Sequence, residues 1–295
     1  MCHPIRTGIV VLALATTLSG PANAAGTVVP FTLNEHHNIV VQATLNGTDA
    51  LTLMLHTASS DITLTEAAVA ASSGLAFPDA HSVKSWGGES DSRVSLGNHL
   101  TIGSLSRDDI TLWENKDSGA GTDGKFGLDF FQSRMIEVDH DHNLLLTHEN
   151  LPAKAAQWHR LDMDTSDRDH LFVEAELVIA GQRYKHRFLV HSGYAGGLLL
   201  DDEFSSLTGL KEKITVTETG RLKDSFGNTL EVHKGSLPML VLGTTSLQDV
   251  PVGFFTGAVG TQKTSVIGTD VLKHFNLIFN LRARVLHLSH RPDDA

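Results

Sequence analysis

Two stretches of the chain share one pattern of apolar and polar positions. Residues 39–56 alternate between the two kinds and then become mostly apolar, with an Asn46-Gly47 pair between these parts. Alternation with a period of two is typical of a half-buried strand, and Asn-Gly favours a tight hairpin turn. Residues 173–191 repeat this pattern around Gly181. The sequence therefore predicts two β-hairpins, each with an apolar end to its second strand.

Each predicted hairpin ends in a histidine that is followed by a small polar turn. The first turn reads His56-Thr57-Ala58-Ser59-Ser60, and the second reads His191-Ser192-Gly193-Tyr194-Ala195-Gly196-Gly197. An apolar segment follows each turn, at residues 62–64 and 198–200. The two histidines are 191 − 56 = 135 positions apart.

The downstream parts of the two halves also match. Phe126-Gly127-Leu128-Asp129-Phe130 corresponds to Ile267-Gly268-Thr269-Asp270-Val271, and a pair of strand-like segments follows each. An ordered set of segments that occurs twice indicates an internal duplication. We predict an N-terminal lobe over residues 25–150 and a C-terminal lobe over 170–295. Residues 151–169 are polar without a clear period and are interpreted as the linker.

The first 24 residues have the features of a cleavable signal peptide. Arg6 precedes an apolar run over residues 8–18, and Ala22-Asn23-Ala24 supplies small residues for cleavage. This run is too short to span a bilayer, which takes about 20 residues, and no later segment reads as transmembrane. Cleavage would also remove Cys2, the only cysteine. We predict a periplasmic or secreted protein.

Composition and net charge limit the kinds of molecule that this protein can bind. The chain has 295 residues, 41% of them hydrophobic, which is typical of a globular protein. Its formal charge is −11, and no basic run offsets it. Nucleic acid is therefore excluded as a partner, because a phosphate backbone needs a basic surface.

The paired motifs resemble those of the retropepsin-like and pepsin-like aspartic peptidases. In that superfamily each half has two apolar residues, Asp, Thr or Ser, and Gly at the end of a strand, and later an apolar pair followed by Gly. Leu55-His56-Thr57-Ala58 and Val190-His191-Ser192-Gly193 match the first motif. The resemblance implies an all-β fold of two β-barrel lobes with a few short helices, related by a pseudo-twofold axis around a cleft. A duplicated chain completes such a cleft as a monomer.

The chain departs from the family at the catalytic pair itself, where His56 and His191 replace both aspartates. The aspartic mechanism needs two carboxylates that share one proton. Each neutral imidazole has one donor and one acceptor, and a second proton on the pair meets like-charge repulsion. We therefore expect no ordinary aspartic peptidase activity. Burial and mutual repulsion are expected to lower the pKa of both imidazoles.

The resemblance also assigns residues around the pair. It implies that the hydroxyls of Thr57 and Ser192 lock the two turns together, and that Gly193 is the family glycine, which Ala58 replaces in the first lobe. The hairpin that closes over a ligand would correspond to Trp86-Gly87-Gly88. An ordinary Gly-Gly turn beside a packed Trp explains that segment equally well.

Three functions remain open from the sequence. The first is a pseudopeptidase that binds a peptide or small-molecule ligand in the cleft without cleaving it. The second is an enzyme of different chemistry, in which His56 and His191 act as acid and base or bind a divalent metal such as Zn²⁺ or Cu²⁺. A third metal ligand cannot be named, and no cofactor is certain. The third function is residual peptidase activity with an unidentified carboxylate, since Asp61 and Asp129 are interpreted as structural.

Overall fold

A computed structural model of the chain describes residues 26–85, 88–116, 119, 121–132, 135–166, 170–223, 229–255 and 262–291. The predicted signal peptide, residues 1–24, lies outside this range, as do Trp86 and Gly87. No helix in the described ranges is long and apolar enough to cross a membrane.

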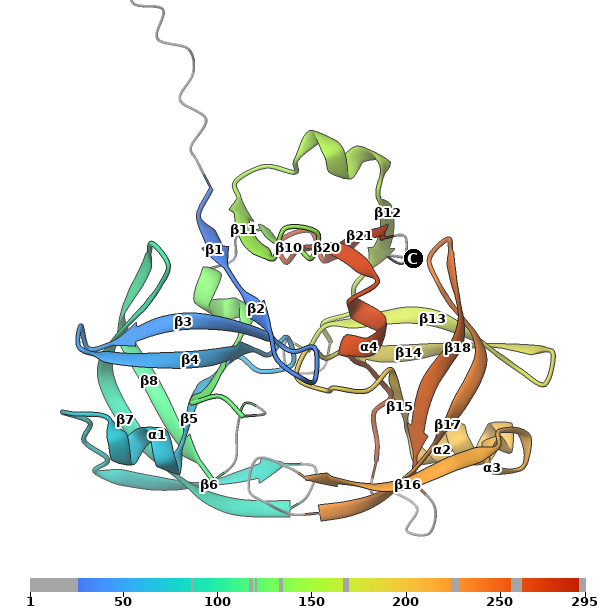
Figure 1. Cartoon of the computed structure of the whole chain (residues 1–295), viewed down its shortest axis with the longest axis horizontal. Coiled ribbons are helices and arrows are strands. Elements are labelled where there is room, and N and C mark those ends of the chain that lie inside the picture. The colour runs from blue at the N-terminus through green and yellow to red at the C-terminus, as the bar shows by residue number, and fades with distance from the viewer. Residues whose placement is uncertain are drawn as a thin grey trace, which may run out of the picture.

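The first lobe is a closed barrel built on an eight-stranded sheet in the order β2-β3-β4-β9-β5-β8-β7-β6, with β3 also pairing with β7 (Figure 1). Its strands are β2 (Thr32–Leu33), β3 (Ile39–Leu45), β4 (Asp49–Leu55), β5 (Ile62–Thr65), β6 (Asp79–Ser85), β7 (Gly88–Ile102), β8 (Leu105–Asn115) and β9 (Gly124–Phe126). The predicted first hairpin is β3–β4. Its turn places both Asn46 and Gly47 at positive φ, which these two residue types adopt readily.

The second lobe repeats this topology in a seven-stranded sheet, in the order β13-β14-β19-β15-β18-β17-β16, with β13 also pairing with β17. The strands are β13 (Phe172–Ile179), β14 (Gln182–Val190), β15 (Leu198–Leu200), β16 (Val216–Lys223), β17 (Thr229–Leu242), β18 (Thr245–Phe254) and β19 (Val266–Ile267). Apart from β2, each strand of the first lobe has a counterpart at the same place. The predicted all-β fold of two barrel lobes is confirmed.

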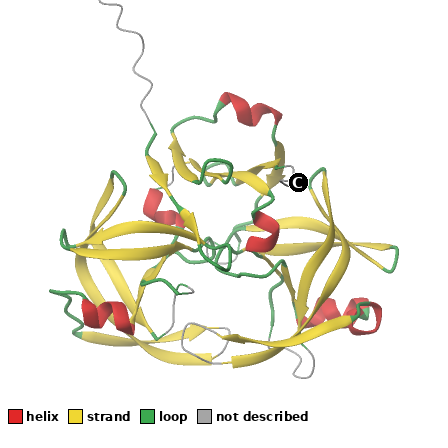
Figure 2. Ribbon diagram, in the orientation of Figure 1, coloured by secondary structure: helices red, strands yellow, loops and turns green. Residues whose placement is uncertain are grey.

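The described helices are short (Figure 2). They are α1 (Glu66–Ala71), η1 (Leu128–Phe131), η2 (Ala153–Gln157), α2 (Asp202–Thr208), α3 (Leu210–Lys213) and α4 (Thr269–Leu272). Two pairs of them, α1 with α2 and η1 with α4, occupy equivalent places in the two lobes. Thr65 caps α1 and Asp201 caps α2, each by accepting a backbone N–H bond on its side-chain oxygen. The 3₁₀ helix η1 and the helix α4 begin directly after Gly127 and Gly268.

A third sheet joins the lobes. It runs β1-β11-β10-β20-β21-β12, so each half of the chain supplies three strands. These are β1 (Val28–Pro30), β10 (Met135–Asp139), β11 (Leu144–His148), β12 (His159–Asp162), β20 (Phe275–Asn280) and β21 (Val285–His290). Strand β12 lies in the segment that we expected to be a linker, and it pairs with β21. Residues 159–162 of this segment thus belong to the shared sheet, because their backbone groups pair with the edge of β21.

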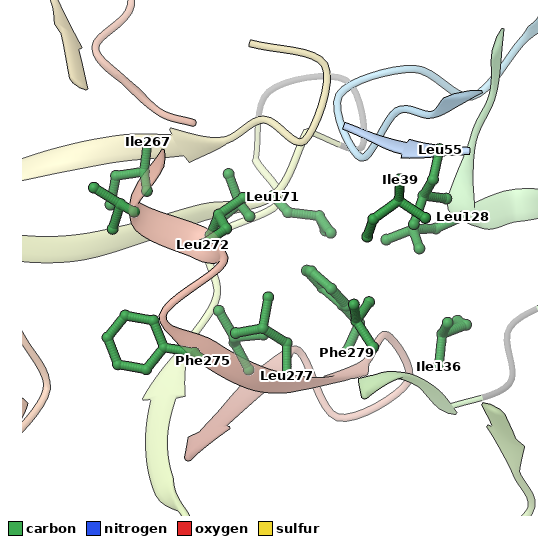
Figure 3. Close-up of a cluster of buried hydrophobic side chains, with 14 of the residues drawn as sticks. Ile39, Leu55, Leu128, Ile136, Leu171, Ile267, Leu272, Phe275, Leu277 and Phe279 are labelled. Atoms are coloured by element: carbon green, nitrogen blue, oxygen red, sulfur yellow. The ribbon is translucent and has the colours of Figure 1, made fainter. Parts of the chain in front are cut away.

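The apolar core extends between this shared sheet and both barrels. Figure 3 shows side chains from β20, including Leu277 and Phe279, facing Leu55 and Leu128 of the first lobe and Leu171 and Leu272 of the second. All six are buried within one hydrophobic cluster. Burial of this kind stabilises by about 25 cal/mol per Å² of apolar surface, so the lobes pack on the sheet as one body.

Strands β6 and β7 form the two arms on either side of residues 86 and 87, which lie outside the described residues. Strands β6 and β7 pair antiparallel from Asp79 opposite Val94 to Ser85 opposite Gly88. The second lobe has the equivalent arms β16 and β17. In Figure 1 the two pairs of arms run toward each other along the lower edge of the molecule.

Candidate functional site

The two histidines lie at the ends of equivalent strands, at the junction of the lobes. His56 follows β4 and His191 follows β14. The backbone N–H of His56 donates to the carbonyl of Phe126, and that of His191 donates to the carbonyl of Ile267, each over 2.9 Å. Each histidine is therefore fixed by the apolar residue that precedes Gly127 or Gly268.

The space around Gly127 and Gly268 explains why the second motif has a glycine at this position. A Cβ at Gly127 would collide with the carbonyl of Ser59, and a Cβ at Gly268 would collide with the carbonyls of Tyr194 and Gly196. Both positions pass directly behind the turn that follows a histidine. The close backbone approach holds each turn in place, which is a function that only glycine allows here.

Reciprocal hydrogen bonds join the two turns beneath the imidazoles. Thr57 Oγ1 donates to the carbonyl of Val190 over 2.7 Å and accepts from the N–H of Ser192 over 3.0 Å. Ser192 Oγ donates to the carbonyl of Leu55 over 2.6 Å and accepts from the N–H of Thr57 over 3.0 Å. All four bonds are buried and cross between the lobes. Each hydroxyl both donates and accepts, so the arrangement has the same form from either side.

The structure brings the two imidazoles into contact. Their ring centroids lie 4.4 Å apart, and the rings are inclined by 60°. His56 is buried, with 9% of its surface exposed, and His191 is partly exposed. Gly193 makes room for this contact, because a Cβ there would press against Cδ2 of His56 and lie 2.7 Å from its Nε2.

The two rings differ in their hydrogen bonds. Nδ1 of His191 accepts from the backbone N–H of Gly193 over 3.2 Å, which places the proton of the neutral ring on Nε2. Nδ1 of His56 is buried and has no hydrogen-bond partner among the described residues. The pseudo-symmetric site is thus chemically asymmetric, with one tautomer fixed by the backbone.

Burial and a neighbouring cation keep both rings neutral. Removal from water lowers the pKa of His56 well below its usual range, and the charge of Lys125 and the facing His191 lower it further. Burial, followed by the charge of Lys125, lowers the pKa of His191 to about 4. His170 adds a smaller effect in the same direction on both rings. The expected direction of both pKa shifts agrees, but Lys125 was not expected.

Lys125 lies on β9, next to Phe126, whose carbonyl anchors His56. Burial lowers the pKa of its ammonium to about 8, and the charge of Asp61 opposes that shift. At neutral pH the amine is therefore mostly protonated while both imidazoles are neutral. The site has a positive charge where a pair of aspartates would give a negative one. A lysine beside Phe126-Gly127 was the only signal in the sequence for this reversal.

The residues around the pair do not favour a metal ion. Within the described ranges, no three His, Cys, Asp or Glu side chains come together in a way that could hold one. His56 and His191 supply two nitrogen ligands, whereas catalytic zinc sites usually have three protein ligands. The positive charge of Lys125 also opposes a cation at this point.

Other residues singled out in the sequence lie around this centre. Ala58 packs against an apolar cluster of the second lobe. Asp61 and Asp129 are exposed, and Asp129 borders a hollow beside the first turn, together with Ser60 and His170. Gly88 begins β7, while Trp86 and Gly87 lie outside the described residues.

A comparison with solved structures finds a protein of similar fold. The crystal structure of an aspartic proteinase from Irpex lacteus matches with a TM-score of 0.59 and 14% sequence identity, over 91% of this chain and 98% of that chain. The chain has the fold of an aspartic proteinase. No protein-family model and no curated protein sequence matches it. At this level of identity the similarity shows the fold alone.

The bonds between the turns give a first prediction. Thr57→Val keeps the shape of the side chain but removes two buried hydrogen bonds and leaves their backbone partners unsatisfied. We expect a loss of about 2–5 kcal/mol in the free energy of unfolding, measured by urea denaturation. The matched control is Thr217→Val on the exposed strand β16, which should change it by less than about 0.5 kcal/mol. Equal effects of the two substitutions would contradict the role of Thr57.

A second prediction concerns the space that Gly193 leaves for the histidine ring. Gly193→Ala should destabilise the protein by about 1–3 kcal/mol, because the new methyl group overlaps the ring of His56. The same substitution in a His56→Ala background should cost much less. This double-mutant cycle isolates the clash from other effects of alanine. A full cost in both backgrounds would show that the ring does not occupy this space.

A third prediction follows from the lowered pKa values. The unfolded chain binds protons at histidine near pH ~6.5, whereas folded His191 binds them only near pH 4. Stability is therefore complete above the unfolded pKa and falls as the pH drops from about 6.5 to 4, by an amount on the order of 2–4 kcal/mol. His140, whose pKa burial also lowers to about 4, adds to this loss.

The matched variant His56→Asn/His191→Asn isolates the contribution of the pair. It should show a shallower dependence of unfolding free energy on pH across this window, since the amides do not titrate. Thermal or urea denaturation at a series of pH values measures it. If the slopes of variant and wild type coincide, the imidazoles are not held neutral by the fold.

Proposed function

We propose that this protein is a pseudopeptidase that binds a peptide or another ligand between its lobes and does not cleave it. The observation that carries the proposal is the contact between His56 and His191, 4.4 Å apart at the positions of the two catalytic aspartates. The fold around them supports a retained binding function. The predicted signal peptide adds the expectation that the mature protein acts in the periplasm or outside the cell, as a monomer.

The chemistry of the pair argues against peptide hydrolysis. In the aspartic mechanism one carboxylate takes a proton from water while the other donates a proton to the scissile carbonyl. Two neutral imidazoles have no negative charge to polarise the water. Protonating either ring at neutral pH is unfavourable, because burial and Lys125 both act against the cationic form. The pair therefore lacks both the base and the acid of that mechanism.

The backbone and hydroxyl contacts that position His56 and His191 are nevertheless present. The four bonds of Thr57 and Ser192, and the close approach at Gly127 and Gly268, all serve to position two facing side chains. A chain that needed only a stable fold could fill this point with apolar side chains. Instead it holds two imidazoles, and the partly exposed His191 carries an Nε2–H that is a donor for a bound ligand.

One observation favours a second candidate, an enzyme with acid–base chemistry of another kind. The unpartnered Nδ1 of His56 is a potential proton acceptor that lies in contact with a ring whose Nε2 carries a proton. Burial lowers the pKa of His56 well below its usual range and makes it a weak base, however, so this chemistry would need a substrate with an easily removed proton. Residual peptidase activity has less support, since His56 and His191 are influenced by Lys125 and His170, which are both basic.

A fourth prediction separates these functions. The wild-type protein should bind members of a random peptide library without producing cleaved products, at either acid or neutral pH, as measured by mass spectrometry. The variant His56→Asp/His191→Asp/Ala58→Gly restores the family motif in both lobes, and we expect it to cleave the same library slowly at acid pH. His56→Asn/His191→Asn serves as the inactive control.

Two outcomes would contradict the proposal. Acid proteolysis by the wild type that a transition-state mimic of aspartic peptidases inhibits would show an active peptidase. Turnover of another compound by the wild type, lost in His56→Asn/His191→Asn, would support the acid–base enzyme instead.

A further inference from the structure

Residues 34–38 form a closed turn that leads into β3. The side-chain oxygen of Asn34 accepts hydrogen bonds from the N–H groups of His36 and Asn38, over 3.0 and 2.9 Å. The backbone groups of Asn34 bond to His37 and Asn38 as well, and His37 has a φ of +60°. An asparagine that bonds to backbone groups a few residues later is a typical turn former. The turn therefore fixes the point from which the Asn38 side chain leaves the backbone.

This turn belongs to the first lobe but is attached to the second. Thr269 Oγ1, at the start of α4, donates to the carbonyl of His36 over 3.2 Å. Asn38 has none of its surface exposed, and its Nδ2 donates to the carbonyl of Ser192 over 2.8 Å in a buried hydrogen bond. A residue of the first lobe thus holds the turn that follows His191.

The first lobe holds Ser192 at each of its polar groups. The N–H of Ser192 donates to Thr57 Oγ1, and its Oγ accepts from the N–H of Thr57 and donates to the carbonyl of Leu55. Asn38 binds the remaining group, the carbonyl oxygen. The position of the second turn is therefore set by the opposite lobe.

One peptide group connects Asn38 to the ring of His191. The carbonyl of Ser192, which Asn38 holds, and the N–H of Gly193 are the two ends of the same planar group. That N–H donates to Nδ1 of His191 over 3.2 Å. Because the group is planar, a bond that orients its carbonyl end also orients its N–H end. A neutral imidazole that accepts on Nδ1 carries its proton on Nε2.

The first turn has a different residue at the equivalent place. Continuing the register of β3 with β4 puts Asn38 opposite His56, and continuing that of β13 with β14 puts His170 opposite His191. His170 therefore takes the place of Asn38, and it is partly exposed. The ring that follows the first turn is His56, whose Nδ1 has no hydrogen-bond partner among the described residues. The lobe that receives an amide from its neighbour thus has the fixed ring.

We propose that Asn38 is a positioning residue of the ligand site. From the opposite lobe it orients the peptide group between Ser192 and Gly193 and so fixes the proton of His191 on Nε2, where it is donated to a carbonyl oxygen of a bound peptide. The part of this inference that concerns the peptide rests on the proposed function. The part that concerns the tautomer of His191 does not.

The first experiment measures the tautomer by long-range ¹H–¹⁵N NMR of the mature chain labelled in histidine, because protonated and unprotonated ring nitrogens have well separated shifts. At pH 7 the His191 ring is neutral, since burial lowers its pKa to about 4. In the wild type its Nδ1 should be unprotonated and its Nε2 protonated, with the signals assigned by comparison with His191→Asn. In Asn38→Leu, which keeps a similar size and removes the donor, both tautomers should be populated.

The matched control is Asn98→Leu. Asn98 is also buried, and its Nδ2 donates to the carbonyl of Ser95 over 3.1 Å on β7. This variant loses a hydrogen bond of the same kind and should leave His191 in one tautomer, so it separates the proposed effect from a general loss of stability. Should Asn38→Leu fail to fold, hydrogen exchange in the wild type gives a second measurement. Slow exchange of an Asn38 Nδ2 proton is expected, and fast exchange of both would overturn the proposal.

A peptide that the wild type selects from a random, acetylated and amidated library tests the ligand part. Fluorescence anisotropy gives its dissociation constant for each variant. If Asn38→Leu populates the two tautomers equally, only half of the molecules present the Nε2–H, and the dissociation constant should rise about twofold. Asn98→Leu should leave it unchanged.

The outcomes separate this inference from the proposed function. A single Nε2–H tautomer of His191 in Asn38→Leu would overturn the role of Asn38 and leave peptide binding intact. A mixture of tautomers with unchanged peptide affinity would overturn the contact between Nε2–H and the peptide. If no library peptide binds, the proposed function fails, whereas the NMR measurement still decides whether Asn38 fixes the tautomer.

Discussion

The reciprocal hydrogen bonds between Thr57 and Ser192 are the constraint on which the site depends. They join two turns that are 135 positions apart, and they do so with four buried bonds in which each hydroxyl donates and accepts. The shared six-stranded sheet joins the lobes, and these bonds set the two strand ends opposite each other. Any pair of side chains placed one residue earlier must then meet face to face.

Charge and hydration decide the protonation state of the two side chains that meet at this point. Two carboxylates in contact share a proton because both cannot be ionised. Two imidazoles in contact can both be neutral, and burial makes that state the stable one for His56 and His191. Lys125 reinforces it by repelling further protons. The same fold thus carries a positive charge beside this pair, where two aspartates would give a negative one.

The two lobes have the same topology but differ in chemistry. Where the second lobe places Val266 and Leu199 in an apolar cluster, the first places Lys125 and Thr63. A duplicated fold that keeps its core-facing residues apolar can vary the opposite face freely, because side chains alternate across each strand. The two lobes therefore share one topology and differ in the polarity of the strand face that carries Lys125 or Val266.

The sequence alone determined the duplication, the strands that end at His56 and His191, and their place opposite each other, since these follow from local periodicity and from an ordered repeat. The lysine beside Phe126-Gly127 did not stand out there, because the effect of Lys125 on the histidine pair depends on the strands that lie beside it. The same holds for β12, whose polar residues pair with β21 through backbone bonds that leave no apolar pattern. Burial, tautomer and charge at the pair were decided by the tertiary structure, because each depends on groups that are distant along the chain and adjacent only after folding.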